Sequence, residues 1–519
     1  MTVESPLLPE EDPADGTALE HERRLELEKN IRADRDFIHN GSRFMIVDNA
    51  SKVLSPLLVL FCAKLYAGGE WGFFKYYESV LLLLTRLAAF GMDRGVVWIY
   101  GQRPGDVSFI RVFSRAANFV FGFAVLLALG AGAHWMGWIP GWSGFGHGAP
   151  GSTGFNIACF LASIPLQATT LLMLQALLNK RRLLPQAIVR NIAIPLATFG
   201  PAALMAFTPF KSHGLAVPYL FGSFLGFGLS LFYFLRAFPM SLREWSGSAK
   251  VPRDMIKFSL PLASTDFAMS LAYRMDILLL ARFVGLQAVE VYSVIVMVAN
   301  TLRSVRQSFD GIMLSVFSRG GKTLTREGRQ KFNHVTWIVL SAQIPFFFLV
   351  LFFGRELLGL ISPAYGSGQH TLLITLGFLV VIAPFGFSTQ LLMGLGKTWA
   401  IPLAQALFFA CTFGFNTLLI PHFGMEGAAT ATGISHLLSG LLCMGVLRWR
   451  LKTWVFDRPY FISVCIEAAI FTIPALVYLI WRPSLVVGAA LFLAAGFAYW
   501  IYFRQAWKHF LKIEAGQQP

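Results

Sequence analysis

Apolar segments of about 20 residues recur along almost the whole length of this 519-residue chain. An α-helix of that length spans the roughly 30 Å hydrocarbon core of a bilayer. Only 14% of the residues are charged, whereas a soluble protein carries about 25%. The sequence therefore predicts an all-α polytopic membrane protein rather than a soluble domain with an anchor.

We expect about fourteen transmembrane helices. If the N-terminus lies inside, the loops on that side hold twenty-three Lys and Arg residues and the opposite loops hold three. Cytoplasmic loops are enriched in basic residues, so both termini are expected in the cytoplasm. The expected spans are residues 43–66, 72–100, 110–137, 153–179, 183–207, 214–236, 254–284, 286–317, 332–354, 371–394, 400–420, 425–447, 459–481 and 484–503.

Several classes of function are disfavoured. The net charge of +15 does not indicate nucleic-acid binding, because the basic residues gather in alternate loops. The five cysteines are scattered in apolar spans, without a disulfide framework or metal-ligand spacing. The Gly396-Lys397-Thr398 sequence lacks the first glycine of a Walker A motif, because Leu391 stands there. We therefore expect no enzyme, catalytic residue, metal, cofactor or nucleic-acid partner.

An internal repeat relates the two halves of the chain. At an offset of 218 residues, Asp48 aligns with Asp266. After a shift of one residue, Arg86 aligns with Arg303, and Asp93 with Asp310. Charged residues are rare in membrane spans, so these matches carry more weight than apolar ones. Each repeat holds six spans, which gives both halves the same orientation, as in parallel-repeat transporters.

The repeat predicts a division of the chain into four parts. Two homologous lobes follow a polar N-terminal segment, and two spans are appended after them. The parts are a cytoplasmic tail (1–42), an N-lobe with spans 1–6 (43–247), a C-lobe with spans 7–12 (248–447), and spans 13–14 with a cytoplasmic C-terminal tail (448–519).

Charged residues within four of the spans recur at helical spacing, which places those of each span on one face. If the four faces converge, they line a cationic cavity between the lobes. The alternative is that each arginine neutralises a nearby aspartate and locks helices together. The expected substrate-binding residues are Lys52, Arg86, Arg274, Arg303 and Arg306, and the expected cavity acids or ion-coupling residues are Asp48, Asp93, Asp266 and Asp310.

Four short segments carry a family resemblance. They are residues 65–74 (LYAGGEWGFF), 89–95 (AFGMDRG), 258–262 (FSLPL) and 289–292 (VEVY). Over about residues 43–447, the chain resembles the Wzx-type polysaccharide (O-antigen) flippases of the multidrug/oligosaccharidyl-lipid/polysaccharide exporter superfamily. It departs from that pattern in its long N-terminal extension and in Glu290, which replaces a small residue.

The resemblance implies a V-shaped, multi-pass transporter of the bacterial cytoplasmic (inner) membrane. Such a protein exports undecaprenyl-diphosphate-type oligosaccharides for surface polysaccharide or lipopolysaccharide biosynthesis by alternating access. An H⁺ or Na⁺ gradient, or the substrate gradient, would drive it. Its partners would be the anionic lipid-linked glycan, membrane lipids, and a polysaccharide polymerase or glycosyltransferases. Three alternatives stay open: a lipid II flippase, a drug/cation antiporter of the same fold, and a membrane scaffold in polysaccharide assembly.

Overall fold

The computed structural model describes residues 51–514, except residues 52–53, 103–105, 137–153, 181, 183, 239–252, 320–323, 325, 453 and 482–483. Helices dominate this described part, which contains no strand. The all-α fold predicted from the sequence is therefore confirmed. The predicted tail (1–42) and two predicted cavity residues, Asp48 and Lys52, lie outside the described residues.

The first half begins with an apolar helix over Leu54–Leu65. The chain then turns at two glycines and returns through α2 and α3. The first-half elements after that helix are α2 (Glu70–Ala89), α3 (Met92–Gln102), α4 (Asp106–Trp135), α5 (Gly154–Leu178), α6 (Leu184–Ala187), the π-helical segment η1 (Ile188–Ala193), α7 (Ile194–Met205), the 3₁₀ turn η2 (Lys211–His213) and α8 (Ala216–Ala237).

The second half begins with two broken spans and continues with the long helix α14. Its longest element, α17, consists of two helices that meet at a non-helical residue, Gly424. The second-half elements are α10 (Arg253–Ala272), α11 (Met275–Phe283), α12 (Leu286–Gln307), α13 (Asp310–Arg319), α14 (Arg326–Gly359), η3 (Pro363–Gly368), α15 (Gln369–Ile382), η4 (Ala383–Phe385), α16 (Ser388–Gly394) and α17 (Ala400–Leu451), followed by the appended α18 (Arg458–Trp481) and α19 (Leu485–Glu514).

Ten helical stretches of the described chain are long and apolar enough to cross a membrane, and α17 is one of them. Three further predicted spans are shorter or more charged: the Leu54–Leu65 helix, α2 with α3, and α10 with α11. With α17 counted as two helices, these make up the fourteen crossings that the sequence predicts. The protein is a multi-pass membrane protein.

Besides the span over 371–394, which η4 interrupts, three spans that we predicted as single helices are broken. The span over 72–100 breaks at Phe90 and Gly91, whose φ angles are 49° and 67°. The span over 286–317 breaks at Ser308–Phe309, between α12 and α13. The span over 254–284 breaks at Tyr273–Arg274, between α10 and α11. The first two breaks stand at equivalent positions of the repeat, and interrupted helices in corresponding positions of two halves mark the binding region in many transporters.

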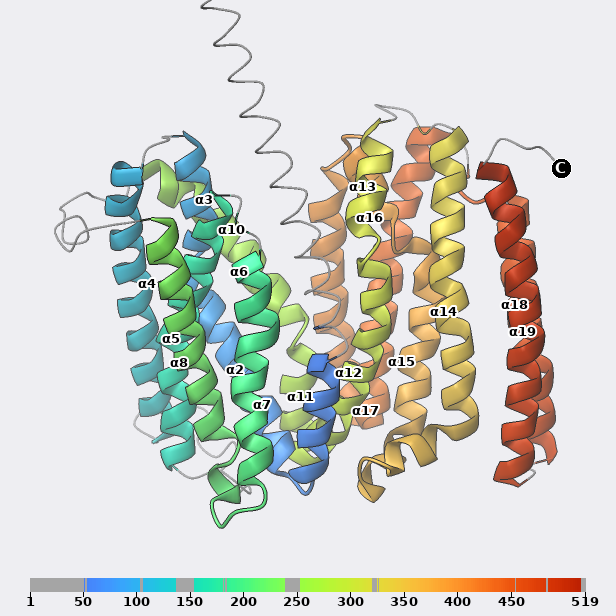
Figure 1. Cartoon of the computed structure of the whole chain (residues 1–519), viewed down its shortest axis with the longest axis horizontal. Coiled ribbons are helices and arrows are strands. Elements are labelled where there is room, and N and C mark those ends of the chain that lie inside the picture. The colour runs from blue at the N-terminus through green and yellow to red at the C-terminus, as the bar shows by residue number, and fades with distance from the viewer. Residues whose placement is uncertain are drawn as a thin grey trace, which may run out of the picture.

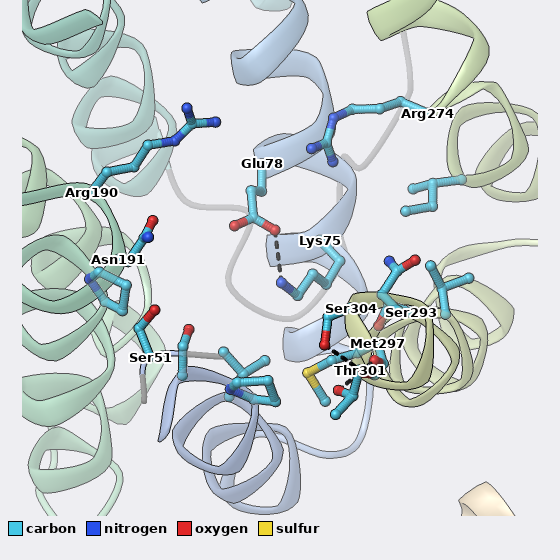
Figure 2. Close-up of a pocket in the computed structure, with 17 residues that line it drawn as sticks. Ser51, Lys75, Glu78, Arg190, Asn191, Arg274, Ser293, Met297, Thr301 and Ser304 are labelled. Atoms are coloured by element: carbon cyan, nitrogen blue, oxygen red, sulfur yellow. Dashed lines mark hydrogen bonds and ion pairs between the residues drawn. The ribbon is translucent and has the colours of Figure 1, made fainter. Parts of the chain in front are cut away.

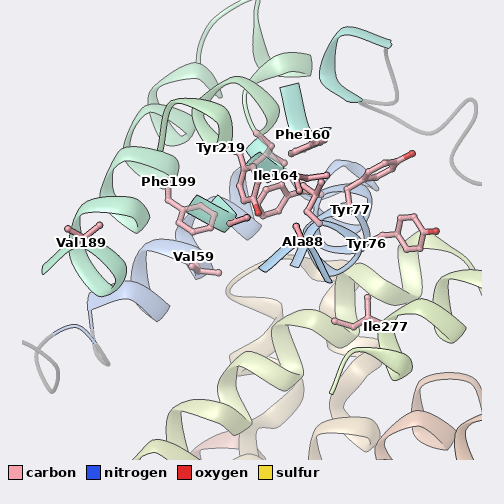
Figure 3. Close-up of a cluster of buried hydrophobic side chains, with 14 of the residues drawn as sticks. Val59, Tyr76, Tyr77, Ala88, Phe160, Ile164, Val189, Phe199, Tyr219 and Ile277 are labelled. Carbon is pink, nitrogen blue, oxygen red and sulfur yellow. The ribbon is translucent and has the colours of Figure 1, made fainter. Parts of the chain in front are cut away.

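Aromatic and aliphatic side chains fill the interior of the first half. Phe160 of α5 packs against Tyr219 of α8 and stacks on Tyr77 of α2, with ring centroids 5.6 and 5.8 Å apart. Figure 3 shows this cluster, with Ile277 of α11 approaching it from the second half. Packing of this kind fixes α2, α5 and α8 as a rigid unit, from which α2 presents its other face to the second half.

The two halves form a V (Figure 1). Helices α3, α4, α5 and α8 gather on one side, and α14 to α17 on the other. The ribbons diverge toward the end at which α3 and α13 lie, and converge at the end where α11 passes into α12. The appended helices α18 and α19 pack against α14, on the outer flank of the second half.

Candidate functional site

A cavity of about 510 Å³ lies between the two halves. Its first-half wall comes from the Leu54–Leu65 helix, α2, η1 and α7, and its second-half wall from α11, α12 and the residue before α11. Figure 2 shows side chains from both halves pointing into this space. Parallel-repeat transporters hold their substrates at this interface between halves.

The cavity is cationic. Lys75, Arg190 and Arg274 line it, and Glu78 alone is acidic among its described lining residues. Lys75 Nζ lies 2.7 Å from Glu78 Oε2 and 4.9 Å from the ring centre of Trp71. Since Glu78 balances one cation, the lining keeps an excess of two positive charges.

Arg190 reaches the cavity from η1, the π-helical segment between α6 and α7. Pro195 follows this segment. Proline cannot donate a backbone hydrogen bond to the residue four positions before it, and its ring clashes there, so a wider π turn relieves the helix. Arg190 and its neighbour Asn191 both line the cavity from this wider turn.

Arg274 is the residue before α11, at the break after α10, with φ −123° and ψ −5°. Its Nη1 lies 3.5 Å from Ser79 Oγ of α2, so it reaches across to the first half. The shared helical face that we predicted for Asp266 and Arg274 is wrong, because the break separates them. Arg274 lines the cavity, whereas Asp266 pairs with Arg94 of α3 at 2.9 Å.

Two other predicted cavity arginines pair with predicted acids. Arg86 Nη1 lies 3.7 Å from Asp93 Oδ2. Arg306 Nη1 lies 2.9 Å from Asp310 Oδ1 and donates to the carbonyl oxygen of Gly386 at 3.0 Å. None of these four charged residues belongs to the described lining of the cavity. Their geometry matches the helix-locking alternative.

Arg303, the repeat counterpart of Arg86, is also absent from the described lining of the cavity. Its charge interacts with Tyr273, Arg306, Tyr292 and Asp276 of the second half. Tyr273 in turn packs on Phe408 and His436, with ring centroids 5.3 and 6.2 Å apart. Arg303 is therefore placed beside an aromatic cluster of the second half.

Sequence reasoning missed Lys75, Glu78 and Arg190. All three are charged residues inside predicted spans, which is the signal that identified the others. The repeat does not point to the first two, because Ser293 and Val296 stand at their positions in the second half. Within the described chain, no group of three or more His, Cys, Asp or Glu is placed to hold a metal ion.

Comparison with known proteins identifies the family. Residues 107–367, just over half of the chain, match the model of the family described as "Polysaccharide biosynthesis protein". The chain belongs to this family. No curated protein matches the chain.

Solved structures share the fold of this polysaccharide biosynthesis protein. An inward-facing multidrug resistance MATE family transporter of the MOP superfamily matches with a TM-score of 0.54 and 13% identity, over 79% of this chain and 98% of that one. An outward-facing MATE family transporter matches with a TM-score of 0.50 and 14% identity, over 80% and 95%. The fold of the chain is therefore the one that these MATE family transporter structures have, and the family match agrees with the resemblance to polysaccharide exporters.

Proposed function

We propose that this protein is a flippase that moves an undecaprenyl-diphosphate-type oligosaccharide across the bacterial cytoplasmic membrane for surface polysaccharide biosynthesis. The observation that carries the proposal is the cavity between the halves, in which three cations face one acid. A diphosphate linkage is a compact anion, and arginine offers a planar fork that suits its oxygens. The family description supports the same reading.

The positions of the two arginines suit alternating access. Figure 2 shows Arg190 and Arg274 reaching inward from opposite sides of the cavity, with Glu78 between them. An anion held by both would draw the halves together, because a ligand favours the arrangement in which it makes more contacts. Lys75 is paired with Glu78, so a phosphate group would compete with Glu78 for it.

Orientation and coupling complete the proposal. With basic loops in the cytoplasm, both termini lie inside, and the substrate is loaded from that side. An H⁺ or Na⁺ gradient, or the substrate gradient, drives transport, and a polysaccharide polymerase or glycosyltransferases would be the protein partners. A drug/cation antiporter fits less well, because a cation-binding cavity needs an excess of acids rather than of bases. A lipid II flippase needs the same cationic lining and is distinguished by experiment.

The test uses purified protein in proteoliposomes with a labelled polyprenyl-diphosphate oligosaccharide. Arg190→Ala and Arg274→Ala should each slow its translocation on the order of tenfold or more, the loss of one charge-assisted hydrogen bond. Arg504→Ala is the matched control, because Arg504 is exposed on the appended α19. Unchanged rates in both cavity variants would contradict the proposal. Faster translocation of lipid II than of the oligosaccharide would favour the lipid II alternative.

A further inference from the structure

Glu290, the residue that departs from the family pattern, joins the two halves. It lies in the first turns of α12 and is only 4% exposed. Its Oε1 accepts a hydrogen bond from the Gly68 N–H at 3.0 Å, and its Oε2 accepts one from the Gly69 N–H at 2.6 Å. The hydroxyl of Tyr365 in η3 lies 3.0 Å from Oε1. One buried carboxylate thus accepts hydrogen bonds from two backbone N–H groups of a turn in the opposite half.

The glycines make this contact geometrically possible. Gly68 and Gly69 have φ angles of 116° and 107°, a region that L-residues with a side chain rarely enter. In this conformation both N–H groups point to the same carboxylate, and such successive N–H groups form an anion-binding concavity. The carboxylate of Glu290 occupies it, and the partners that donate to it are neutral.

The contact between Glu290 and the Gly68–Gly69 turn lies next to the cavity, on the side where the two halves converge (Figure 1). Ser293, one helical turn beyond Glu290, lines the cavity. Its hydroxyl donates to the Glu290 carbonyl oxygen at 2.8 Å and accepts from Trp71 Nε1 of α2 at 3.1 Å. Lys64 adds another bond between the halves, to the carbonyl oxygen of Leu360 at 3.1 Å. In Figure 1 this is the end where the halves converge, opposite the end where α3 and α13 lie.

We propose that Glu290 and the Gly68–Gly69 turn form the outer gate of the transport pathway. While the carboxylate is seated on the two N–H groups, the halves are held together beneath the cavity and the non-cytoplasmic end is closed. Release of the carboxylate lets this end open. The inference rests on the alternating access proposed above, but not on the identity of the substrate.

The test measures the accessibility of the cavity from outside. All five native cysteines are replaced, and a single cysteine is introduced by Asn300→Cys, because Asn300 is exposed and lines the cavity. Intact cells are then treated with a membrane-impermeant maleimide. Glu290→Gln replaces one of the two accepting oxygens by an NH₂ group, which faces a backbone N–H that it cannot accept from, so labelling should rise on the order of tenfold. Glu356→Gln is the matched control, because Glu356 is an exposed acid near the end of α14, and it should leave labelling unchanged.

A second variant and the absence of substrate from the assay allow the gate to be tested by itself. Tyr365→Phe removes one hydroxyl, which lies 3.0 Å from Glu290 Oε1 and 3.0 Å from the Ala63 carbonyl oxygen of the opposite half. It should therefore raise labelling in the same direction by a smaller factor, even if Glu290→Gln folds poorly. Wild-type labelling in each folded variant would overturn the gate and leave Glu290 as a fixed structural tie. The assay needs no substrate, so a failure of the lipid-linked oligosaccharide proposal is distinguishable from a failure of the gate.

Discussion

The guanidinium of Arg86 lies 3.7 Å from the carboxylate of Asp93, across the break that separates α2 from α3. The second half repeats the arrangement with Arg306 and Asp310, 2.9 Å apart across the break between α12 and α13. Each aspartate lies in the first turn of the helix after the break, where the helix dipole favours a negative charge. Each ion pair therefore connects the two helices of a broken span.

Removing one member of the first pair should destabilise the protein. Asp93 is only 3% exposed, so Arg86→Ala leaves a buried carboxylate without its arginine, a loss of about 3–5 kcal/mol. We expect a lower melting temperature in detergent, followed by fluorescence-detected size-exclusion chromatography. The double variant Arg86→Ala/Asp93→Asn should recover part of the loss, because the two residues act as a pair. Equal melting temperatures for the wild type and Arg86→Ala would falsify this account.

Substitution of Arg306 should affect mainly the stability of the protein, and substitution of Arg274 should affect mainly transport. Arg306 is held by Asp310 and the Gly386 carbonyl oxygen and lies 5.7 Å from the ring centre of Phe387. Arg306→Ala should therefore lower the melting temperature of the protein, because it loosens the packing of the second half. Arg274 is half-buried and lines the cavity, so Arg274→Ala should slow translocation with little change in melting. Parallel measurement of both quantities in both variants checks the contrast, and a reversed pattern would show that the roles are exchanged.

The sequence predicted the helices of this protein better than its cavity. Spans of about 20 apolar residues follow from hydropathy, because the bilayer leaves a chain few other choices. The identity of the cavity residues depends on helix breaks that single residues impose. The chain changes direction at Phe90–Gly91 and at Tyr273–Arg274. The second of these breaks is the reason why Asp266 and Arg274 do not share a helical face.

Arg190 illustrates the other limit of the sequence. Its span is apolar, and one arginine in it has no repeat partner that would mark it. Only the π turn before Pro195 and the approach of α12 from the other half place it in the cavity. Helix periodicity carries no information on which helices of the two halves face each other. The charge of Arg190 within a span marks it as unusual, but only the fold shows that it faces the cavity.

A methyl group at Gly72 should prevent the halves from closing beneath the cavity. A Cβ there would overlap the carbonyl oxygen of Leu286, at the start of α12. Backbone on both sides cannot give way as a flexible side chain does. Gly72→Ala should therefore reduce translocation and raise labelling of the Asn300→Cys probe from outside. Gly101→Ala serves as the control, because nothing lies within 4 Å of a Cβ at that position. Normal translocation and labelling in Gly72→Ala would show that the contact is dispensable.

Glu467 should tie the appended helices to the second half through hydrogen bonding rather than through charge. It is fully buried at 0% exposure, and its Oε1 accepts from the Ser341 hydroxyl of α14 at 2.8 Å. The hydroxyl of Tyr499 in α19 donates to the Ser341 carbonyl oxygen at 2.6 Å, which joins a third helix to the same point.

Two substitutions of Glu467 separate the contribution of its hydrogen bond from that of its charge. Glu467→Gln keeps the shape and an acceptor for Ser341, and a neutral amide avoids placing a charge in an apolar bundle, so the melting temperature should stay near the wild-type value or rise. Glu467→Ala removes the acceptor and leaves a void, at about 2–4 kcal/mol, and should lower it. Thermal unfolding in detergent measures both. A large loss of stability in Glu467→Gln would mean that the carboxylate is held as an ion. A loss of translocation without a loss of stability would instead assign Glu467 to the transport cycle.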